Sequence, residues 1–239
     1  MTIIRSLFLW AFFGILNTLF WILFGILLTL VLAPSRVIHL YCAVPWAKII
    51  LWGARIKVHT RGLANIDRQK AYILIPNHLS FFDIFSLLAA LPVDFRFILK
   101  KELIRIPILG WSMKRAGYIS IDRSSPAKAR RTFKQAVDRI RGGTSLVMFA
   151  EGTRGYDGHL QPLKRGAFQL AMASGVPVVP VAITGTRDIM PKGSFTIRKG
   201  SIVIQLEKPI ETTSYTKQTM PDLIERVSGS ITAMLAEQE

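Results

Sequence analysis

Hydrophobic positions divide the chain into an apolar N-terminal part and a longer part in which apolar and polar stretches alternate. Residues 7–32 carry no charged side chain, and the strongly polar residues among them are Asn17, Thr18 and Thr29. As a helix, these 26 residues would extend about 39 Å, more than the roughly 30 Å hydrocarbon core of a bilayer. We therefore predict a membrane segment ending at Pro34. Its length leaves open whether it crosses the bilayer or turns back within one leaflet.

A cleavable secretory signal is the alternative interpretation of this segment, because Ala33, Pro34 and Ser35 outline a small-residue cleavage site. The apolar run is well beyond the usual length of the apolar region in such a signal. A second apolar stretch also follows directly. Both observations favour a retained anchor.

The second apolar stretch, residues 37–56, is interrupted by basic residues and a proline. We predict an interfacial helix at the lipid headgroups, a depth that suits Trp46 and Trp52. His39 and Cys42 lie three residues apart here, but apolar surroundings and the lack of a nearby carboxylate in the sequence argue against a nucleophilic pair. Residues 1–56 are thus predicted to form the membrane anchor.

Charge is distributed unevenly along the chain. Arg5 precedes the membrane segment, whereas several basic residues follow it before the first acidic residue, Asp67: Arg36, Lys48, Arg55, Lys57 and Arg61. The positive-inside rule places the bulk of the protein in the cytoplasm. A net charge of +16 indicates anionic partners such as membrane headgroups, phosphorylated substrates or nucleic acid. A single cysteine excludes an intrachain disulfide framework and suits a reducing location.

Beyond the anchor, buried strands and helices alternate, which predicts an α/β fold with a mixed, mainly parallel sheet flanked by helices. We assign residues 57–239 to one catalytic domain. Pro177 and Pro180 argue that the strand at 176–183 is an edge or irregular strand. The predicted strands are 71–75, 95–99, 117–121, 144–149, 176–183 and 201–206, and the helices are 84–91, 126–141, 164–174 and 222–236.

Candidate chemistry follows the strand at 71–75, in the sequence Pro-Asn-His-Leu-Ser-Phe-Phe-Asp at 76–83. A neutral imidazole can take a proton from a hydroxyl near pH 7, and a carboxylate on its other nitrogen fixes its tautomer. Helical positions five residues apart point about 140° away from each other. We therefore expect His78 before the helix and Asp83 in its first turn. The alternative role of Asp83 is a capping box with Ser80, and Ser80 is itself a rival nucleophile.

Several function classes find no support in the sequence. There is no His-Glu-x-x-His motif, no clustered His and Cys set, and no Gly-x4-Gly-Lys-Ser/Thr loop, so we expect no metal and no bound cofactor. Residues 67–239 retain 25 basic and 15 acidic residues. These charges are dispersed among apolar runs without a nucleic-acid-binding motif, so no nucleic-acid partner is expected.

Four blocks carry a family resemblance when taken in order: Asn77-His78-x4-Asp83, Gly117-x-Ile119-x-Ile121-Asp122-Arg123, Glu151-Gly152-Thr153-Arg154 and Val176-Pro177-Val178-Val179-Pro180. The chain resembles the glycerolipid acyltransferases, specifically the bacterial 1-acyl-sn-glycerol-3-phosphate acyltransferases, over roughly residues 57–206. It departs from the common pattern at Ala150, where many members have Pro, and at Gly155, where many have Ser. Neither departure touches the presumed reacting groups, so they put the implied substrate preference in doubt more than the implied activity.

The resemblance implies transfer of a fatty acyl group from acyl-CoA or acyl carrier protein, as cosubstrate, to the sn-2 hydroxyl of lysophosphatidic acid. It implies direct attack without an acyl-enzyme. His78 would be the base and Asp83 its orienting acid, with Arg154 binding the acceptor phosphate as a bidentate fork. The remaining expected substrate-binding residues are Lys100, Arg123, Glu151, Gly152 and Thr153. Glu151 is expected to fix the loop or bind a glycerol hydroxyl, and Gly152 to allow close backbone approach with donors for an oxyanion.

The resemblance also implies a bacterial inner membrane location with membrane lipids as partners. Two alternatives remain open. One is a related acyltransferase acting on glycerol 3-phosphate, another lysophospholipid or an aminolipid. The other is a basic membrane-binding protein without catalytic activity.

Overall fold

The computed structural model describes residues 2–30, 34–107, 109–121 and 125–237. Seven strands form one sheet with the order β1-β7-β6-β2-β5-β3-β4. Within the described residues, neighbouring strands pair in parallel except β6 and β7, which are antiparallel. The predicted mixed, mainly parallel α/β fold is confirmed. The strands are β1 (Ile56–Arg61), β2 (Ile73–Pro76), β3 (Phe95–Lys100), β4 (Ile119–Ile121), β5 (Ser145–Val147), β6 (Val178–Thr184) and β7 (Gly200–Leu206).

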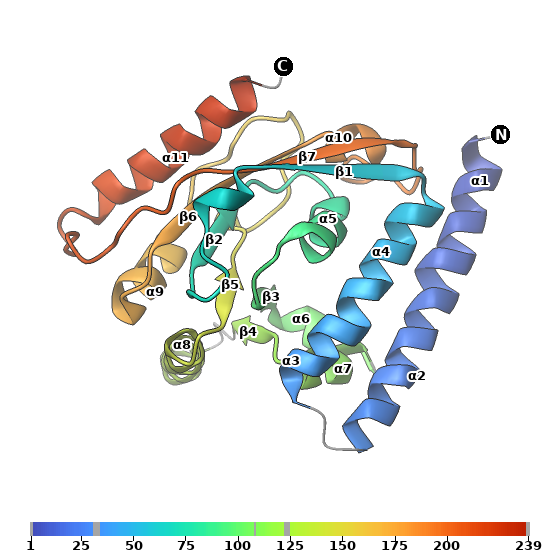
Figure 1. Cartoon of the computed structure of the whole chain (residues 1–239), viewed down its shortest axis with the longest axis horizontal. Coiled ribbons are helices and arrows are strands. Elements are labelled where there is room, and N and C mark those ends of the chain that lie inside the picture. Colours follow the sequence, from blue (N-terminus) through green and yellow to red (C-terminus); the bar gives the residue numbers. More distant parts are fainter. Residues whose placement is uncertain (1, 31–33, 108, 122–124, 238–239) are drawn as a thin grey trace.

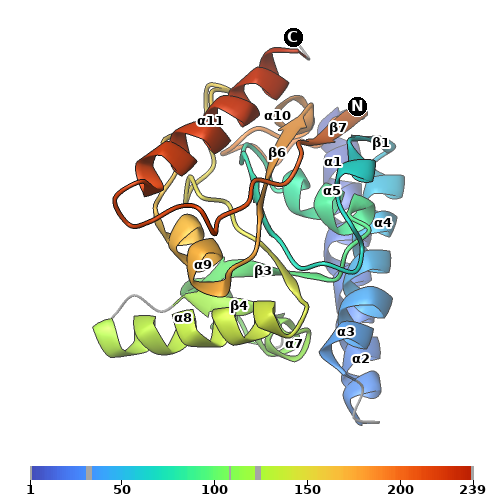
Figure 2. The same cartoon turned by 60° about the vertical axis from the view of Figure 1, so that its left-hand side comes forward.

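Helices cover both faces of the sheet (Figures 1 and 2). One face packs against α4 and α5, and the other against α8, α9 and α11. The helical elements are α1 (Thr2–Leu9), α2 (Asn17–Leu30), α3 (Ser35–Ile38), α4 (Val44–Gly53), α5 (Phe82–Ala90), α6 (Lys101–Ile104), α7 (Leu109–Arg115), α8 (Pro126–Arg141), α9 (Gly166–Ser174), α10 (Thr186–Ile189), α11 (Met220–Ala236), the π-helices η1 (Trp10–Leu16) and η2 (His39–Ala43), and the 3-10 turn η3 (Leu63–Asn65).

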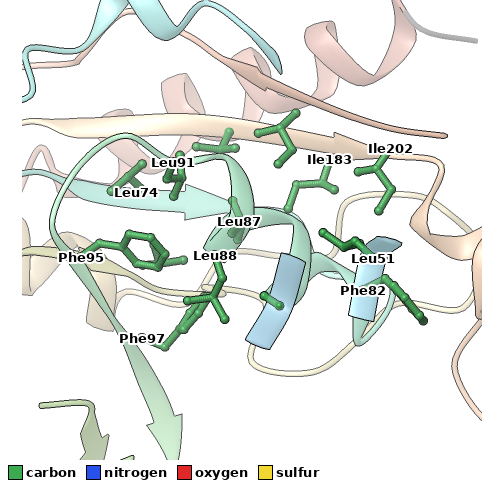
Figure 3. Packing of buried hydrophobic residues seen from close by; sticks show 14 of the residues in the cluster. Leu51, Leu74, Phe82, Leu87, Leu88, Leu91, Phe95, Phe97, Ile183 and Ile202 are labelled. Atoms are coloured by element: carbon green, nitrogen blue, oxygen red, sulfur yellow. The ribbon is translucent and has the colours of Figure 1, made fainter. Parts of the chain in front are cut away.

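Strand alternation explains why both faces of the sheet are apolar. Ile73 and Ile75 of β2 point to the α8, α9 and α11 side, whereas Leu74 belongs to the cluster under α4 and α5. Figure 3 shows the cluster under α4 and α5, where Leu74, Leu87 and Phe95 pack together. A strand buried on both faces has a nearly continuous apolar sequence, as parallel sheets require. The core therefore fixes where β2 ends and where the loop after it begins.

The proline-containing strand was predicted to be an edge or an irregular strand, and the edge position is wrong. β6 lies inside the sheet between β7 and β2. Pro180 accepts a hydrogen bond from Glu207 N (3.0 Å) on the β7 side, and the β6–β7 ladder begins one residue later, at Val181 and Leu206. In a strand, the N–H and the carbonyl of one residue point to the same side, so the N–H that Pro180 lacks would point toward β7, just beyond the end of this ladder. The proline therefore removes no hydrogen bond to β2.

The apolar N-terminal helix lies along the flank of the domain, antiparallel to the α3–η2–α4 helix (Figure 1). Near its start, Arg5 Nη2 donates to Ala54 O (2.7 Å) and Trp10 Nε1 donates to Phe195 O (2.7 Å). Further along, Asn17 Nδ2 donates to Trp46 O (3.2 Å). The helix is thus held to the domain at several points along its length.

Residues Ile3–Thr29 form a helix long and apolar enough to cross a membrane, with a mean hydropathy of 2.2 and only 11% of its most apolar window buried. This is consistent with the predicted membrane association. Of the two tryptophans predicted for the headgroup region, Trp52 is exposed. Trp46 instead packs on the core, with its indole N–H donating to Thr18 Oγ1 (2.9 Å) and its ring edge-on to Phe85.

Candidate active site

His78 and Asp83 meet at the junction of β2 and α5, as their spacing predicts. His78 lies in the loop after β2, and Asp83 lies in the first turn of α5. His78 Nδ1 is 2.7 Å from Asp83 Oδ2. The carboxylate side chain is 1% exposed and the imidazole 15% exposed. A buried acid therefore holds a histidine that a substrate can reach.

Asp83 also caps its own helix, so the two alternative roles coexist. Its Oδ2 atom accepts hydrogen bonds from Leu79 N and Ser80 N, both at 2.8 Å. Ser80 Oγ accepts a hydrogen bond from Phe82 N (3.2 Å) and donates its proton to Met190 O (2.7 Å). Ser80 is fully buried. A buried hydroxyl whose proton is already donated to a carbonyl is poorly placed to act as a nucleophile, which favours the capping role.

Phe149 stacks on the imidazole, a contact that the sequence analysis did not anticipate. Its ring centroid lies 3.9 Å from that of His78, with 20° between the planes. Phe97 stacks behind it at 6.1 Å. With Nδ1 bound to Asp83 and one ring face covered, the imidazole is fixed in rotation and Nε2 is left for chemistry. The only signal in the sequence is an aromatic residue two positions before Glu151, at the end of a buried strand.

Glu151 joins the histidine loop to the loop after β5. Its Oε1 atom accepts a hydrogen bond from His78 N (2.6 Å) and its Oε2 atom accepts one from Gln161 N (2.8 Å). In return, Gly155 N donates to His78 O (2.8 Å). Burial raises the pKa of Glu151 to about 7, although the two backbone hydrogen bonds lower it. Of the two roles expected for Glu151, the contacts show the structural one.

Arg154 lies in this same loop, next to the residue that is tied to His78. Its guanidinium carbon is 4.0 Å from the centroid of the Phe81 ring. Phe81 belongs to the loop that carries His78. The base and the cation predicted to bind phosphate therefore come from two loops that are joined by two hydrogen bonds, from His78 N to the Glu151 carboxylate and from Gly155 N to His78 O.

Comparison with known proteins identifies the family. A model of the Acyltransferase family matches residues 57–184. The chain belongs to this acyltransferase family. Its match begins at β1 and includes all the elements that carry His78, Asp83, Glu151 and Arg154.

Several named acyltransferases are similar to this chain. A chloroplastic 1-acyl-sn-glycerol-3-phosphate acyltransferase of Brassica napus is 37% identical over 177 residues, which are 73% of this chain and 51% of that protein. The 1-acyl-sn-glycerol-3-phosphate acyltransferase of Saccharomyces cerevisiae is 33% identical over 172 residues, 71% of this chain and 57% of the yeast protein. This chain spans about half the length of the chloroplastic relatives of Brassica napus and Arabidopsis thaliana.

A solved structure extends the likeness over the full chain. The crystal structure of the 1-acyl-sn-glycerophosphate (LPA) acyltransferase PlsC from Thermotoga maritima has a TM-score of 0.84 and 25% sequence identity. It covers 100% of this chain, and the match covers 98% of the Thermotoga protein. The similarity therefore includes the N-terminal helices as well as the acyltransferase domain.

The backbone conformation of Gly152 and the partner of its N–H bear on the role expected for it in this acyltransferase. Its backbone has φ of +77°, a conformation that favours glycine, and a side chain there would meet Lys164 Nζ. Its N–H donates to Phe149 O (3.0 Å). Because this donor is already used within the loop, the expected contribution of Gly152 to an oxyanion site is not supported. Thr153, next in sequence, is exposed beside Arg154.

The two remaining predicted residues of the acyltransferase site are not placed by the structure. Lys100 is the last residue of β3, and its side chain lies outside the described part of the chain. Arg123 lies entirely outside the described residues. Among the residues that the structure does describe, no group of three or more His, Cys, Asp or Glu side chains is arranged to hold a metal ion.

Proposed function

We propose that this acyltransferase transfers a fatty acyl group from acyl-CoA or acyl carrier protein to the sn-2 hydroxyl of lysophosphatidic acid, yielding phosphatidic acid. The observation that carries this proposal is the histidine–carboxylate pair linked through Glu151 to the loop of Arg154. This arrangement supplies a base for an alcohol and a cation for a phosphate from the same pair of joined loops. The names of the similar proteins supply the substrate class.

In the proposed reaction, the acceptor hydroxyl donates its proton to His78 Nε2 while its oxygen attacks the thioester carbonyl. The Asp83 carboxylate stabilises the imidazolium that forms. This attack forms the ester C–O bond and a tetrahedral oxyanion. Collapse of that intermediate re-forms the carbonyl and breaks the C–S bond, and the imidazolium returns the proton to the leaving thiolate. The roles of Lys100 as a further phosphate contact and of Arg123 as a substrate contact stay part of this proposal, as does the absence of any metal or bound cofactor.

We also propose that the enzyme works at the cytoplasmic face of a bacterial inner membrane, with its N-terminal helix embedded in one leaflet. Arg5 in α1 donates to Ile197 O (3.4 Å), and Trp10 at the start of η1 donates to Phe195 O (2.7 Å), and both acceptors belong to the catalytic domain. A helix crossing the roughly 30 Å hydrocarbon core would draw these contacts into the lipid. A helix lying in the near leaflet keeps them, and its exposed apolar side, which includes Ile4, Leu7 and Phe8, faces the acyl chains.

The test is an acceptor comparison with purified full-length protein in detergent micelles. One acyl-CoA is offered with lysophosphatidic acid, glycerol 3-phosphate, a lysophospholipid bearing a headgroup, or an aminolipid acceptor. We expect efficient acylation of lysophosphatidic acid, and Arg154→Lys should raise its KM about tenfold because an ammonium cannot form the bidentate contact. No turnover of lysophosphatidic acid together with good turnover of another acceptor would contradict the proposed substrate.

The donor is tested in the same assay by replacing acyl-CoA with acyl carrier protein loaded with the same chain. Activity with either thioester fits the proposal. Treatment with a chelator should leave the rate unchanged, since no step uses a metal ion. Loss of activity that one divalent ion restores would contradict this part of the proposal.

A further inference from the structure

The guanidinium of Arg154 packs on the face of an aromatic ring. The guanidinium lies over Phe81, which is 45% exposed and comes immediately before α5. A cation over the face of a ring is attracted by the ring quadrupole. In a planar guanidinium, the N–H groups point outward in the plane. Among the described residues, no carboxylate forms an ion pair with Arg154.

The backbone of the same loop is held by a lysine from another part of the chain. Lys192 Nζ donates to Arg154 O (2.8 Å) and to Thr153 Oγ1 (3.4 Å). The ammonium also lies 3.7 Å from the centroid of the Tyr156 ring. Two oxygens and a ring thus bind this one cation to the loop that carries Arg154.

The segment of Lys192 supports both active-site loops. Two residues earlier, Met190 O accepts the hydrogen bond from Ser80 Oγ in the histidine loop. Phe81 follows Ser80 directly. The ring beneath Arg154 and the ammonium that holds its backbone are therefore positioned by the same short segment after α10.

We propose that Phe81 and Lys192 are positioning residues for the acceptor phosphate, an inference that rests on the proposed transfer to a phosphorylated acceptor. Phe81 holds the Arg154 guanidinium with its edge available to the phosphate, and Lys192 fixes the backbone from which that side chain extends. An arginine on a loop loses side-chain freedom when it binds a ligand. Ordering it beforehand lowers that cost, so both residues strengthen acceptor binding.

This role predicts an effect on KM with little effect on kcat. A contact that holds the phosphate equally in the ground state and the transition state changes binding without changing the chemical step. The reacting proton is on His78, whose hydrogen bonds to Asp83 and Glu151 do not involve the Phe81 side chain. Replacement of Phe81 should therefore leave the base intact.

The experiment compares Phe81→Leu and Phe81→Trp with the wild type, using lysophosphatidic acid and the same lysolipid without its phosphate. We expect Phe81→Leu to raise the KM for lysophosphatidic acid about three- to tenfold, with kcat within about twofold. Phe81→Trp should keep the wild-type KM, because tryptophan is the aromatic side chain that attracts a cation most strongly. Turnover of the phosphate-free acceptor should not change in either variant, and thermal unfolding confirms that each is folded.

Lys192→Met keeps the length of the side chain but removes its charge, and it should raise the same KM. Lys199→Met is the matched control, since Lys199 is an exposed lysine outside this contact, and its KM should equal that of the wild type. In an Arg154→Ala background, Phe81→Leu should have no further effect because the side chain it supports is gone.

An unchanged KM for lysophosphatidic acid in folded Phe81→Leu protein would overturn the inference and leave the proposed function intact. Equal losses with both acceptors would also overturn it, since they would show a general structural defect. If the wild type fails to acylate lysophosphatidic acid, the proposed substrate is wrong. The inference is then tested by repeating the same comparison with whichever phosphorylated acceptor the enzyme does use. If the enzyme acylates only phosphate-free acceptors, both the proposed function and this inference are overturned.

Discussion

Two histidines in this chain have a hydrogen-bonding partner at Nδ1, and the partners differ in kind. His78 is bound by the carboxylate of Asp83 at 2.7 Å and is partly accessible. His39 is buried, with Tyr118 Oη at 3.2 Å. Burial and the nearby positive charge of Arg96 lower the pKa of His39 to about 3. His39 is therefore neutral at any pH at which the enzyme works.

The comparison shows what makes a histidine a base. A base must reach its substrate and must gain from holding the proton, which requires access and a nearby negative charge. His78 has both. His39 lacks access, and the effect of the nearby Asp94 carboxylate on its pKa is outweighed by burial and by the positive charge of Arg96. The contacts of His39 instead join η2 to the strand region of Tyr118 and so help to attach the anchor helices to the domain.

Removing the charge from the partner of His78 should have the largest effect of the following substitutions. In Asp83→Asn, a single amide oxygen can still accept the three hydrogen bonds that Oδ2 now accepts. The negative charge is lost, and the amide NH2 takes the place of Oδ1, a buried atom that has no hydrogen-bond partner among the described residues. We expect kcat to fall about a hundredfold or more. Asp157→Asn, in an exposed position, is the control and should keep full activity, and a loss of less than about threefold in Asp83→Asn would contradict the role of the carboxylate.

Breaking the tie between the two loops should have an intermediate effect. Both carboxylate oxygens of Glu151 accept backbone N–H groups. In Glu151→Gln, the amide NH2 must face one of these donors, which leaves that donor unpaired at a cost of about 1–3 kcal/mol. We expect about a tenfold lower kcat/KM and a lower melting temperature. Unchanged activity in this variant would show that the alignment of the loops does not depend on Glu151.

The pH dependence of stability provides a separate check on Glu151. Because burial raises its pKa from an ordinary value of 4.5 to about 7, the folded protein binds the proton more tightly than the unfolded chain. The contribution of this group is therefore greatest below about pH 4.5 and is lost as the pH rises to about 7. The melting temperature of the wild type relative to Glu151→Gln should fall across this range. A difference that stays constant or grows with pH would contradict the raised pKa.

The smallest effect on activity is expected at the other histidine. His39→Phe keeps a ring against Phe95 but leaves the Tyr118 hydroxyl without its partner, which should lower the free energy of unfolding by about 1–3 kcal/mol. Activity per folded molecule should stay within about twofold. Thermal unfolding and an active-fraction assay measure the two quantities, and a large loss of kcat in fully folded protein would contradict the structural role of His39.

How far the site could be predicted from the sequence depended on distance along the chain. His78 and Asp83 are five residues apart at a strand end, so spacing and capping chemistry were enough to predict their meeting. Glu151 and Arg154 were predicted through the order of the motifs. Nothing local could show that Glu151 binds the backbone of His78, because the contact depends on the pairing of β2 with β5.

The contacts that were missed involve side chains from distant parts of the chain. Phe149 falls in the predicted strand at 144–149, and an apolar residue at a strand end gives no sign of which ring it will contact. Lys192 is 38 residues from Arg154 and lies in no motif. The fold was predicted more fully, and its main error, the position of β6, arose because Pro180 lies just beyond the β7 ladder, which a sequence rule about prolines does not show.

The most direct test of the central claim is the rate of phosphatidic acid formation by His78→Ala, measured with acyl-CoA and lysophosphatidic acid and compared with binding of the same protein to anionic lipid vesicles. If His78 removes the proton from the acceptor hydroxyl, kcat should fall about a thousandfold while vesicle binding and melting temperature stay close to wild type. A folded, membrane-bound His78→Ala protein that retains kcat within tenfold of the wild type would contradict the claim.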